Sequence, residues 1–261
     1  MCTVVLRIAP AEPFPLILAA NRDERVDRAW DPPSAWWPDR PDVIGGRDST
    51  AGGTWMALNQ AGVVACVLNR PGSLGPAPGK RSRGLLPLLA LEQKSASAAS
   101  AAIQAIPAED FRSFNLVLGD TETAICLRSE GTGPITPIPL EPGVHMITAR
   151  DPDDTQSPRV ARALPRFRAA PPPDPAQAEW ASWETILADR SGPPGSEINV
   201  PERAGFGTVC ASLLALPRHG KPIWLFAAGP PDRAPFVPLG PEFQGRPGGR
   251  APSVFLRTSR R

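Results

Sequence analysis

The sequence predicts an α+β fold in which two antiparallel sheets pack face to face and a layer of helices covers each outer face. The chain opens with strand-like segments that have no crossover helix between them, which favours antiparallel pairing. Helical segments then occur in two pairs, each placed between groups of strands. Two sheets between two helical layers would bury the apolar faces of all these elements, so we expect a four-layer αββα sandwich.

The elements follow from local patterns. Apolar runs bounded by turn residues predict strands at residues 2–8, 16–20, 54–58, 63–68, 115–118, 124–128, 144–148, 207–216, 223–228 and 236–239. Helical periodicity predicts helices at 84–90, 97–106, 159–168 and 179–188. The Pro- and Trp-rich stretch 30–42 is expected to be an ordered loop, and 45–55 a Gly-rich turn that leads into a strand. We expect residues 1–240 to form a single domain and residues 241–261, rich in Gly, Pro and Arg, to form a tail.

Composition and charge argue against several classes of protein. The 261 residues are 41% hydrophobic and 21% charged, an ordinary balance for a globular domain. The net charge of +2 gives no field strong enough to indicate a nucleic-acid or membrane partner. No stretch approaches the roughly 20 apolar residues that cross a bilayer, and no secretory leader is recognisable. We therefore expect a cytoplasmic protein with no membrane span, whose partner is a small-molecule substrate or ligand; the oligomeric state is left open.

One of the cysteines stands apart from the others by its position. Cys66, Cys126 and Cys210 lie in apolar strand-like runs and are expected to be buried core residues. Cys2 directly follows the initiator Met, which is usually removed when the second residue is small. The exposed α-amino group, with a pKa of about 7.7–8.0, would then serve as a base for the thiol on the same residue. The alternative is that Cys2 is a small apolar residue that opens a strand.

A polar tetrapeptide, Asn21-Arg22-Asp23-Glu24, follows the second predicted strand. Burying all four side chains without partners would be costly, so some of them must pair or face a cleft. Arg22 could hold Asp23 or a substrate carboxylate, and Asn21 could donate to an oxyanion. The alternative is a hairpin exit with surface charges.

Several motifs in order resemble those of one family. They are the opening MC, the AANRDE that contains the tetrapeptide, GGTW at 52–55, NLVLGD at 115–120 and FGTVCASLLAL at 206–216. Together they resemble the NRDE family, which includes the eukaryotic transport and Golgi organisation protein 2. The resemblance implies an N-terminal nucleophile hydrolase-type fold, with Cys2 at the nucleophile position and the tetrapeptide beside it. The fold is similar to that of bile-salt and penicillin V amidases, which separate their Arg and Asp by two residues; here Arg22 and Asp23 are adjacent.

Other residues complete the candidate site. Asn69 and Asn115 each follow or open a strand and could supply an amide to the oxyanion, or serve as turn and cap residues. Trp55 could wall an apolar pocket, and His145 opens the stretch HMITAR where the family commonly has an H-x-LSN-like sequence. The predicted catalytic residues are Cys2, Asn21, Arg22, Asp23 and Asn115, and the predicted substrate-binding residues are Glu24, Trp55, Asn69 and His145. Two His with scattered carboxylates make a poor metal set, so no metal site is predicted.

Three functions are compatible with these residues. The first is a cysteine hydrolase of the N-terminal nucleophile type that cleaves a carbon–nitrogen (amide) bond of a small molecule and needs no cofactor. The second is a non-catalytic carrier or chaperone for haem or a lipid or acyl ligand, because the resemblance links the family to haem trafficking and lipid homeostasis. Cys2, His145 or His219 would then be the axial haem ligand. The third is an interaction protein that uses its Trp- and Pro-rich loops as a surface.

Overall fold

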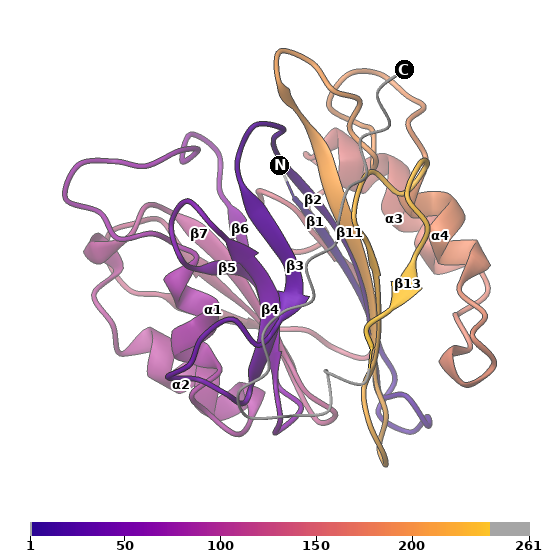
Figure 1. Cartoon of the computed structure of the whole chain (residues 1–261), viewed down its shortest axis with the longest axis horizontal. Helices are drawn as coiled ribbons and strands as arrows, with labels where there is room; N and C mark the ends of the chain where they lie inside the picture. Colours follow the sequence, from indigo (N-terminus) through magenta and orange to yellow (C-terminus); the bar gives the residue numbers. More distant parts are fainter. Residues whose placement is uncertain (1, 241–261) are drawn as a thin grey trace, which may run out of the picture.

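The computed structural model describes residues 2–240, and two antiparallel sheets form its centre (Figure 1). The first sheet has the strand order β10-β1-β2-β11-β12-β13, with bounds β10 Gly143–Ile147, β1 Thr3–Ile8, β2 Leu16–Arg25, β11 Phe206–Leu216, β12 Ile223–Ala227 and β13 Val237–Pro238. The second has the order β3-β4-β5-β6-β7-β8-β9, with bounds β3 Trp30–Ser34, β4 Val43–Asp48, β5 Thr54–Asn59, β6 Val64–Asn69, β7 Phe114–Gly119, β8 Ala124–Ser129 and β9 Thr136–Pro139. Every strand pair in residues 2–240 is antiparallel, as predicted.

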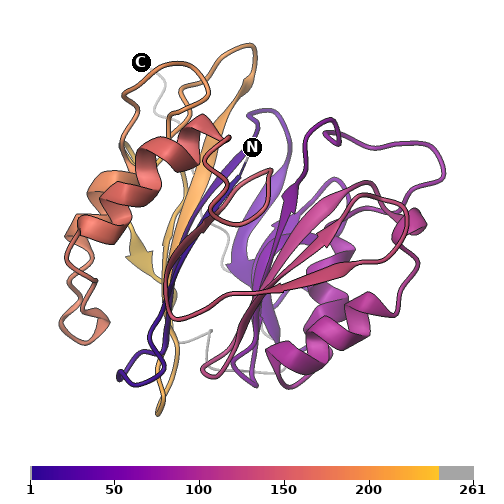
Figure 2. The same ribbon diagram turned by 180° about the vertical axis from the view of Figure 1, so that it is seen from behind.

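Helices cover the outer face of each sheet, so the predicted αββα sandwich is confirmed (Figure 2). Helices α1 (Leu85–Ala90) and α2 (Ala96–Gln104) pack on the second sheet, where Leu86 and Ala99 share a core with Leu116 of β7. Helices α3 (Pro158–Ala169) and α4 (Ala181–Leu187) cover the first sheet. Their buried Phe167 and Trp183 rings meet edge to face, with centroids 5.2 Å apart.

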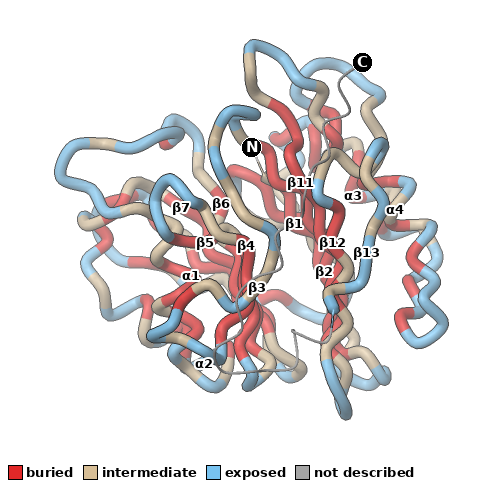
Figure 3. Tube along the Cα trace, in the orientation of Figure 1, coloured by how far each residue is buried: buried red, intermediate tan, exposed pale blue. Residues whose placement is uncertain are grey.

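The central core lies between the two sheets and follows the two-residue period of the strands. On β2, Leu16, Leu18 and Ala20 face the second sheet, whereas Ile17 and Ala19 face α3 and α4. Most strands are buried along most of their length, whereas the loops that join them are largely exposed (Figure 3). Burying a single Leu side chain stabilises the fold by roughly 1.5–3 kcal/mol, so this alternation fixes the register firmly.

Two of the predicted loops are strands, and the prediction for them is wrong. The stretch 30–42 contains β3, and the Gly-rich stretch 45–55 contains most of β4. Glycine here serves close packing instead of a turn: a Cβ on Gly45 would lie 2.5 Å from the Cβ of Ala57, and one on Gly46 would lie 2.2 Å from the ring of Trp55. Strand β9 was also missed, because its Pro content argues against a strand and is tolerated here at the sheet edge.

The second strand is longer than predicted, which matters for the site. β2 continues to Arg25, so the polar tetrapeptide lies within the strand and not beyond its end. In residues 2–240, no helix has the length and apolar character needed to cross a membrane. The predicted tail, residues 241–261, lies outside the described residues.

Candidate active site

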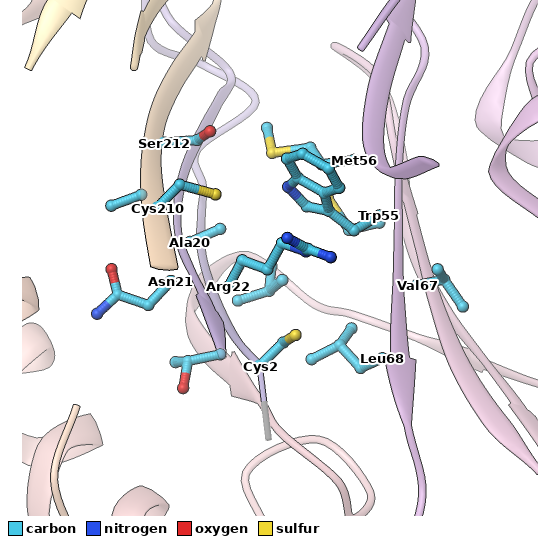
Figure 4. Close-up of a pocket in the computed structure, with 14 residues that line it drawn as sticks. Cys2, Ala20, Asn21, Arg22, Trp55, Met56, Val67, Leu68, Cys210 and Ser212 are labelled. Atoms are coloured by element: carbon cyan, nitrogen blue, oxygen red, sulfur yellow. The ribbon is translucent and has the colours of Figure 1, made fainter. Parts of the chain in front are cut away.

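The alternation of β2 divides the tetrapeptide between two faces of the sheet. Asn21 and Asp23 face the helical layer, whereas Arg22 and Glu24 face the space between the sheets. The Asn21 side-chain amide donates to the carbonyl oxygens of Leu187 at 3.0 Å and Ile198 at 3.1 Å. In Figure 4 its side chain points away from Arg22 and Trp55. These bonds tie β2 to the end of α4, and the amide donors of Asn21 are not directed at Cys2.

Asp23 forms a buried ion pair with Arg159 of α3. Asp23 Oδ2 accepts from Arg159 Nη1 at 2.8 Å, and Asp23 Oδ1 accepts from the Thr208 hydroxyl at 2.7 Å. The same Arg159 nitrogen donates to Thr3 Oγ1 at 2.8 Å. The side chains of Asp23 and Arg159 are only 0% and 6% exposed. A buried pair of this kind is stable because each charge is hydrogen-bonded, and it joins β1, β2, β11 and α3 beneath Cys2.

A β-bulge in β11 allows that arrangement. The register of β11 against β2 shifts between Thr208 and Cys210. In a regular strand these two residues would share a face, but here Thr208 reaches Asp23 while Cys210 lines the hollow between the sheets. Bulges next to active sites commonly re-aim side chains in this way.

Arg22 connects the two sheets. Its guanidinium carbon lies 4.3 Å from the ring centroid of Trp55, which belongs to β5 of the second sheet. Arg22 Nη2 is also 3.7 Å from Glu24 Oε2, and Arg22 Nη1 is buried with no hydrogen-bond partner in the described part of the chain. A desolvated cation over an indole ring contributes up to about 2 kcal/mol. The unused donor on Nη1 is available for a ligand.

The Cys2 thiol lies at this junction. Strands β1 and β2 pair so that Thr3 is opposite Asn21, and the Cys2 Sγ is 3.7 Å from the main-chain oxygen of Asp23. Burial raises the pKa of the Cys2 thiol above its ordinary value; the Asp23 carboxylate raises it further and the Arg22 cation lowers it. Cys2 is therefore a partly buried thiol next to a cation (Figure 4).

Two connected hollows meet at Cys2. The inner hollow, of about 20 Å³, lies between the sheets and has mainly apolar walls, including Val4, Met56 and Leu68. The outer cleft, of about 420 Å³, opens beyond it and has both charged and apolar side chains in its walls. The residues shared by both linings are Cys2, Arg22, Trp55 and Val67.

Among the predicted substrate-binding residues, Glu24, Trp55 and Asn69 line the outer cleft. Glu24 Oε2 is 3.8 Å from Arg28 Nε as well as near Arg22. Asn69 ends β6, is half-buried and lines the cleft. These positions bring the three residues together with Cys2 and Arg22.

Asn115 and His145 are placed elsewhere. The Asn115 amide donates to the carbonyl oxygens of Thr148 at 3.1 Å and Arg150 at 2.6 Å, and its oxygen accepts from Arg70 at 2.9 Å. It lines neither hollow and holds the chain after β10 against β7. The catalytic role predicted for Asn115 stays a prediction, and these contacts do not favour it.

Both ring nitrogens of His145 also form hydrogen bonds within the protein. Nδ1 lies 2.8 Å from Asp153 Oδ2, and Nε2 lies 2.8 Å from the carbonyl oxygen of Glu141. The hydrogen bond to Asp153 raises the pKa of His145, while partial burial opposes that rise. Neither ring nitrogen is directed at the cleft of Cys2.

Sequence reasoning did not find Arg159 or Thr208. Arg159 reaches Asp23 from 136 residues further along the chain, and no local pattern indicates such a contact. Thr208 lies in the FGT motif, which was noted only as part of the resemblance. Among residues 2–240, no group of three or more His, Cys, Asp and Glu side chains could hold a metal ion.

The fold and the position of Cys2 define a class of protein, the N-terminal nucleophile hydrolase fold. Among solved structures the chain is similar to penicillin V acylase from Agrobacterium tumefaciens, with TM-score 0.56, 16% identity, and coverage of 87% of this chain and 83% of that one. It is also similar to a Caenorhabditis elegans orthologue of N-acylethanolamine-hydrolysing acid amidase, with TM-score 0.55, 10% identity, and coverage of 82% and 92%. A conjugated bile acid hydrolase from Clostridium perfringens gives TM-score 0.55 and 11% identity, with coverage of 95% of both chains.

The sequence profile of the Transport and Golgi organisation 2 family matches residues 1–222, and the chain belongs to that family. No curated protein matches the chain in sequence. At identities of 10–16%, the structural similarity shows the fold alone.

Proposed function

We propose that the protein is an N-terminal-cysteine hydrolase that cleaves an amide bond of a small molecule. The observation that carries the proposal is the position of the Cys2 thiol, at the junction of a small apolar hollow and a larger cleft, beside Arg22. The structural neighbours, an acylase, an acid amidase and a bile acid hydrolase, support the same class of reaction.

The chemistry requires the α-amino group of Cys2, which removal of Met1 would free. That amine takes the thiol proton while Sγ attacks the amide carbonyl and forms a carbon–sulfur bond. The proton then passes to the leaving nitrogen as the carbon–nitrogen bond breaks. Water, deprotonated by the same amine, attacks the thioester, which releases a carboxylic acid and restores the thiol.

Two side chains are available to stabilise the oxyanion formed in these steps. Arg22 has a buried nitrogen with no partner in the described residues, and Asn69 lines the outer cleft. Donors fixed in place before the reaction stabilise the charge without reorganisation, and losing one typically costs about 10²–10³ in kcat. The outer cleft, of about 420 Å³, has room for a small amide substrate, whereas the inner hollow, of about 20 Å³, has room for about one water molecule. The acyl group and the leaving amine would therefore both lie in the outer cleft.

A carrier role on the same site is the second candidate. It is favoured by the pKa of Cys2, which burial raises, because a neutral thiol is a poor nucleophile. The outer cleft, of about 420 Å³, has apolar as well as polar walls that suit an acyl ligand, and Cys2 could bind haem iron as an axial ligand. In this case removal of Met1 is unnecessary.

We place the protein in the cytoplasm. All four cysteines of the described chain are free thiols, which agrees with a reducing compartment.

One experiment tests the hydrolase against the carrier. Purified protein is examined by intact-mass spectrometry for loss of Met1 and by absorption spectroscopy for bound pigment, and is then assayed with a panel of N-acyl amides. Turnover that Cys2→Ala abolishes and the buried control Cys126→Ala retains would support the hydrolase. Retention of Met1 with a saturable Soret shift on addition of haem, and no turnover, would replace it with the carrier.

A further inference from the structure

The outer cleft has one wall that carries unneutralised positive charge. Lys80, Arg83 and Arg112 line the cleft together with Cys2. The other cations of its lining have carboxylate partners: Arg22 has Glu24 at 3.7 Å, Arg28 has Asp48 at 2.7 Å, and Arg81 has Asp110 at 3.6 Å. Within residues 2–240, no carboxylate is paired with Lys80, Arg83 or Arg112. We call these three residues the basic wall.

Arg83 offers an open edge of its guanidinium to the cleft. Its Nη1 donates to the Ser73 carbonyl oxygen at 2.6 Å, the Ser73 hydroxyl at 2.8 Å and the Ser113 carbonyl oxygen at 3.2 Å. No hydrogen bond from its Nε or Nη2 occurs in the described chain. Nε and Nη2 form the parallel pair of donors that binds a carboxylate or phosphate in bidentate fashion. The protein therefore holds one corner of the guanidinium and leaves the recognition edge unused.

Arg112 is held in a similar way. Its Nη1 donates to the Leu74 carbonyl oxygen at 2.6 Å, and its Nη2 donates to the Gly72 carbonyl oxygen at 2.5 Å. Main-chain carbonyls fix the position of a cation without neutralising its charge. A ligand that binds here does not have to order these side chains, so less of its binding energy is lost.

Electrostatics connects the basic wall to the nucleophile. Burial lowers the pKa of Arg83 to about 10 and the neighbouring Arg112 cation lowers it too, while the thiolate of Cys2 and the carboxylate of Glu24 act in the opposite direction. Arg83 thus remains charged at pH 7, is partly desolvated beside a like charge, and is within electrostatic range of Cys2. An anion bound at Arg83 would relieve this repulsion.

We propose that the basic wall binds an anionic group, a carboxylate or a phosphate, on the part of the substrate that lies in the outer cleft. The substrate class is then an N-acyl amide whose amine portion carries an acid group. The amide part of this statement rests on the proposed hydrolase function, whereas the anion site itself does not. Arg83 sets specificity by its open edge, with Arg112 and Lys80 adding charge.

The anion site is tested by comparing two alkylating reagents on Cys2. Iodoacetate and iodoacetamide transfer their carbon to the same sulfur with loss of iodide, and they differ in that one is an anion. Peptide mapping gives the ratio of the two rates for Cys2. We expect Arg83→Gln to lower the iodoacetate-to-iodoacetamide ratio roughly tenfold, at the low end of the rate effect of a focused field. Lys94→Gln, which removes an equal charge from an exposed site outside the cleft lining, should leave the ratio unchanged.

A second variant and a second measurement test the anion site if Arg83→Gln does not fold or if Cys2 does not react with either reagent. Lys80→Gln alters an exposed side chain, so it should fold normally and lower the ratio by a smaller factor. Inorganic phosphate and succinate should each be tested for a rise in Tm, because a ligand that binds only the folded state stabilises it. A rise with one anion that Arg83→Gln abolishes identifies which acid group the wall prefers. An unchanged reagent ratio, or the lack of any rise in Tm where Cys2 resists both reagents, would overturn the proposal.

A matched pair of substrates separates this inference from the proposed function. Two amides with the same acyl chain are compared, one with a neutral amine portion and one whose amine portion ends in a carboxylate. Faster turnover of the acidic amide, reduced to the neutral rate by Arg83→Gln, supports both statements. Equal turnover of the two amides would support the hydrolase function and contradict the anion site. A rise in Tm with an anion, without turnover of either amide, would support the anion site and contradict the hydrolase function.

Discussion

The guanidinium of Arg22 lies over the indole ring of Trp55, with the guanidinium carbon 4.3 Å from the ring centroid. This contact crosses from β2 of one sheet to β5 of the other, at the point where the inner hollow meets the outer cleft. The Trp55 ring also meets Trp30 edge to face, with centroids 5.9 Å apart. Arg22 is therefore held as a fixed cation beside the Cys2 thiol.

Replacing Arg22 by Gln should weaken both the reactivity of Cys2 and any hydrolysis. The Arg22 cation lowers the pKa of Cys2, so its removal leaves the thiol with a still higher pKa and less thiolate at a given pH. The alkylation profile of Cys2 should move to higher pH, and kcat should fall by about 10²–10³ if Arg22 donates to the oxyanion. Alkylation rates between pH 6 and 10, read by peptide mapping, check the first effect. An unshifted profile would show that Arg22 does not act on the thiol.

The ion pair of Asp23 and Arg159 should matter for stability far more than an exposed pair at the end of the same strand. Asp23→Asn leaves the buried Arg159 charge without its carboxylate, which should lower the free energy of unfolding by about 3–5 kcal/mol. The control is Asp27→Asn, which removes the partner of Arg25 where both side chains are more than half exposed. That change should leave the free energy of unfolding nearly unchanged, because solvent screens an exposed ion pair. Urea unfolding gives the loss in free energy of unfolding for each variant. Equal losses for the two variants would contradict the structural role of Asp23.

The pair of His145 and Asp153 predicts a dependence of stability on pH. The Asp153 carboxylate raises the folded-state pKa of His145, so the folded protein holds this proton more tightly than the unfolded chain. The resulting stabilisation is fully present below the unfolded pKa of about 6.5 and is lost as pH rises through the higher folded value. His145→Gln should remove this part of the pH profile of Tm. His219→Gln, at an exposed position, should retain it.

Much of the site can be predicted from the sequence. Strand β2 shows which part can be predicted and which part cannot. Leu16, Leu18 and Ala20 face the intersheet core, and continuing that alternation places Arg22 and Glu24 on the same face. Because the strand was predicted to end at residue 20, the four polar residues were treated as one group. The structure assigns two of them to the cleft and two to the helical layer.

Other features depend on contacts that no local pattern carries. Gly45 and Gly46 indicated a turn, yet they serve the close approach of Ala57 and the Trp55 ring to β4. Asn115 was chosen by its residue type at the opening of a strand, and only the packing of β7 against the chain after β10 reveals that its amide is fully engaged. Residues joined across long stretches of sequence, such as Asp23 and Arg159, could be assigned only from the fold.

A further prediction concerns the reactivity of Cys2 itself. Iodoacetamide should modify Cys2 well before the other three thiols, because burial raises the pKa of all four and access to the reagent therefore decides the order. Cys2 is the half-buried one of the four. Equal or slower labelling of Cys2 would show that it is not an accessible nucleophile, and the carrier role would then be favoured.

The base is tested separately from the thiol, with an N-terminal extension that keeps Cys2 in a peptide bond. In this form the thiol remains, but its neighbouring nitrogen can no longer accept a proton. Hydrolysis should fall as far as in Cys2→Ala, while alkylation of Cys2 at high pH should persist, since that reaction needs only the thiolate. Cys2→Ser should retain at most a small residual activity, because a hydroxyl is harder to deprotonate than a thiol. If the extended protein hydrolyses amides as fast as the mature form, the α-amino group is not the base, and Cys2 must act through another proton acceptor.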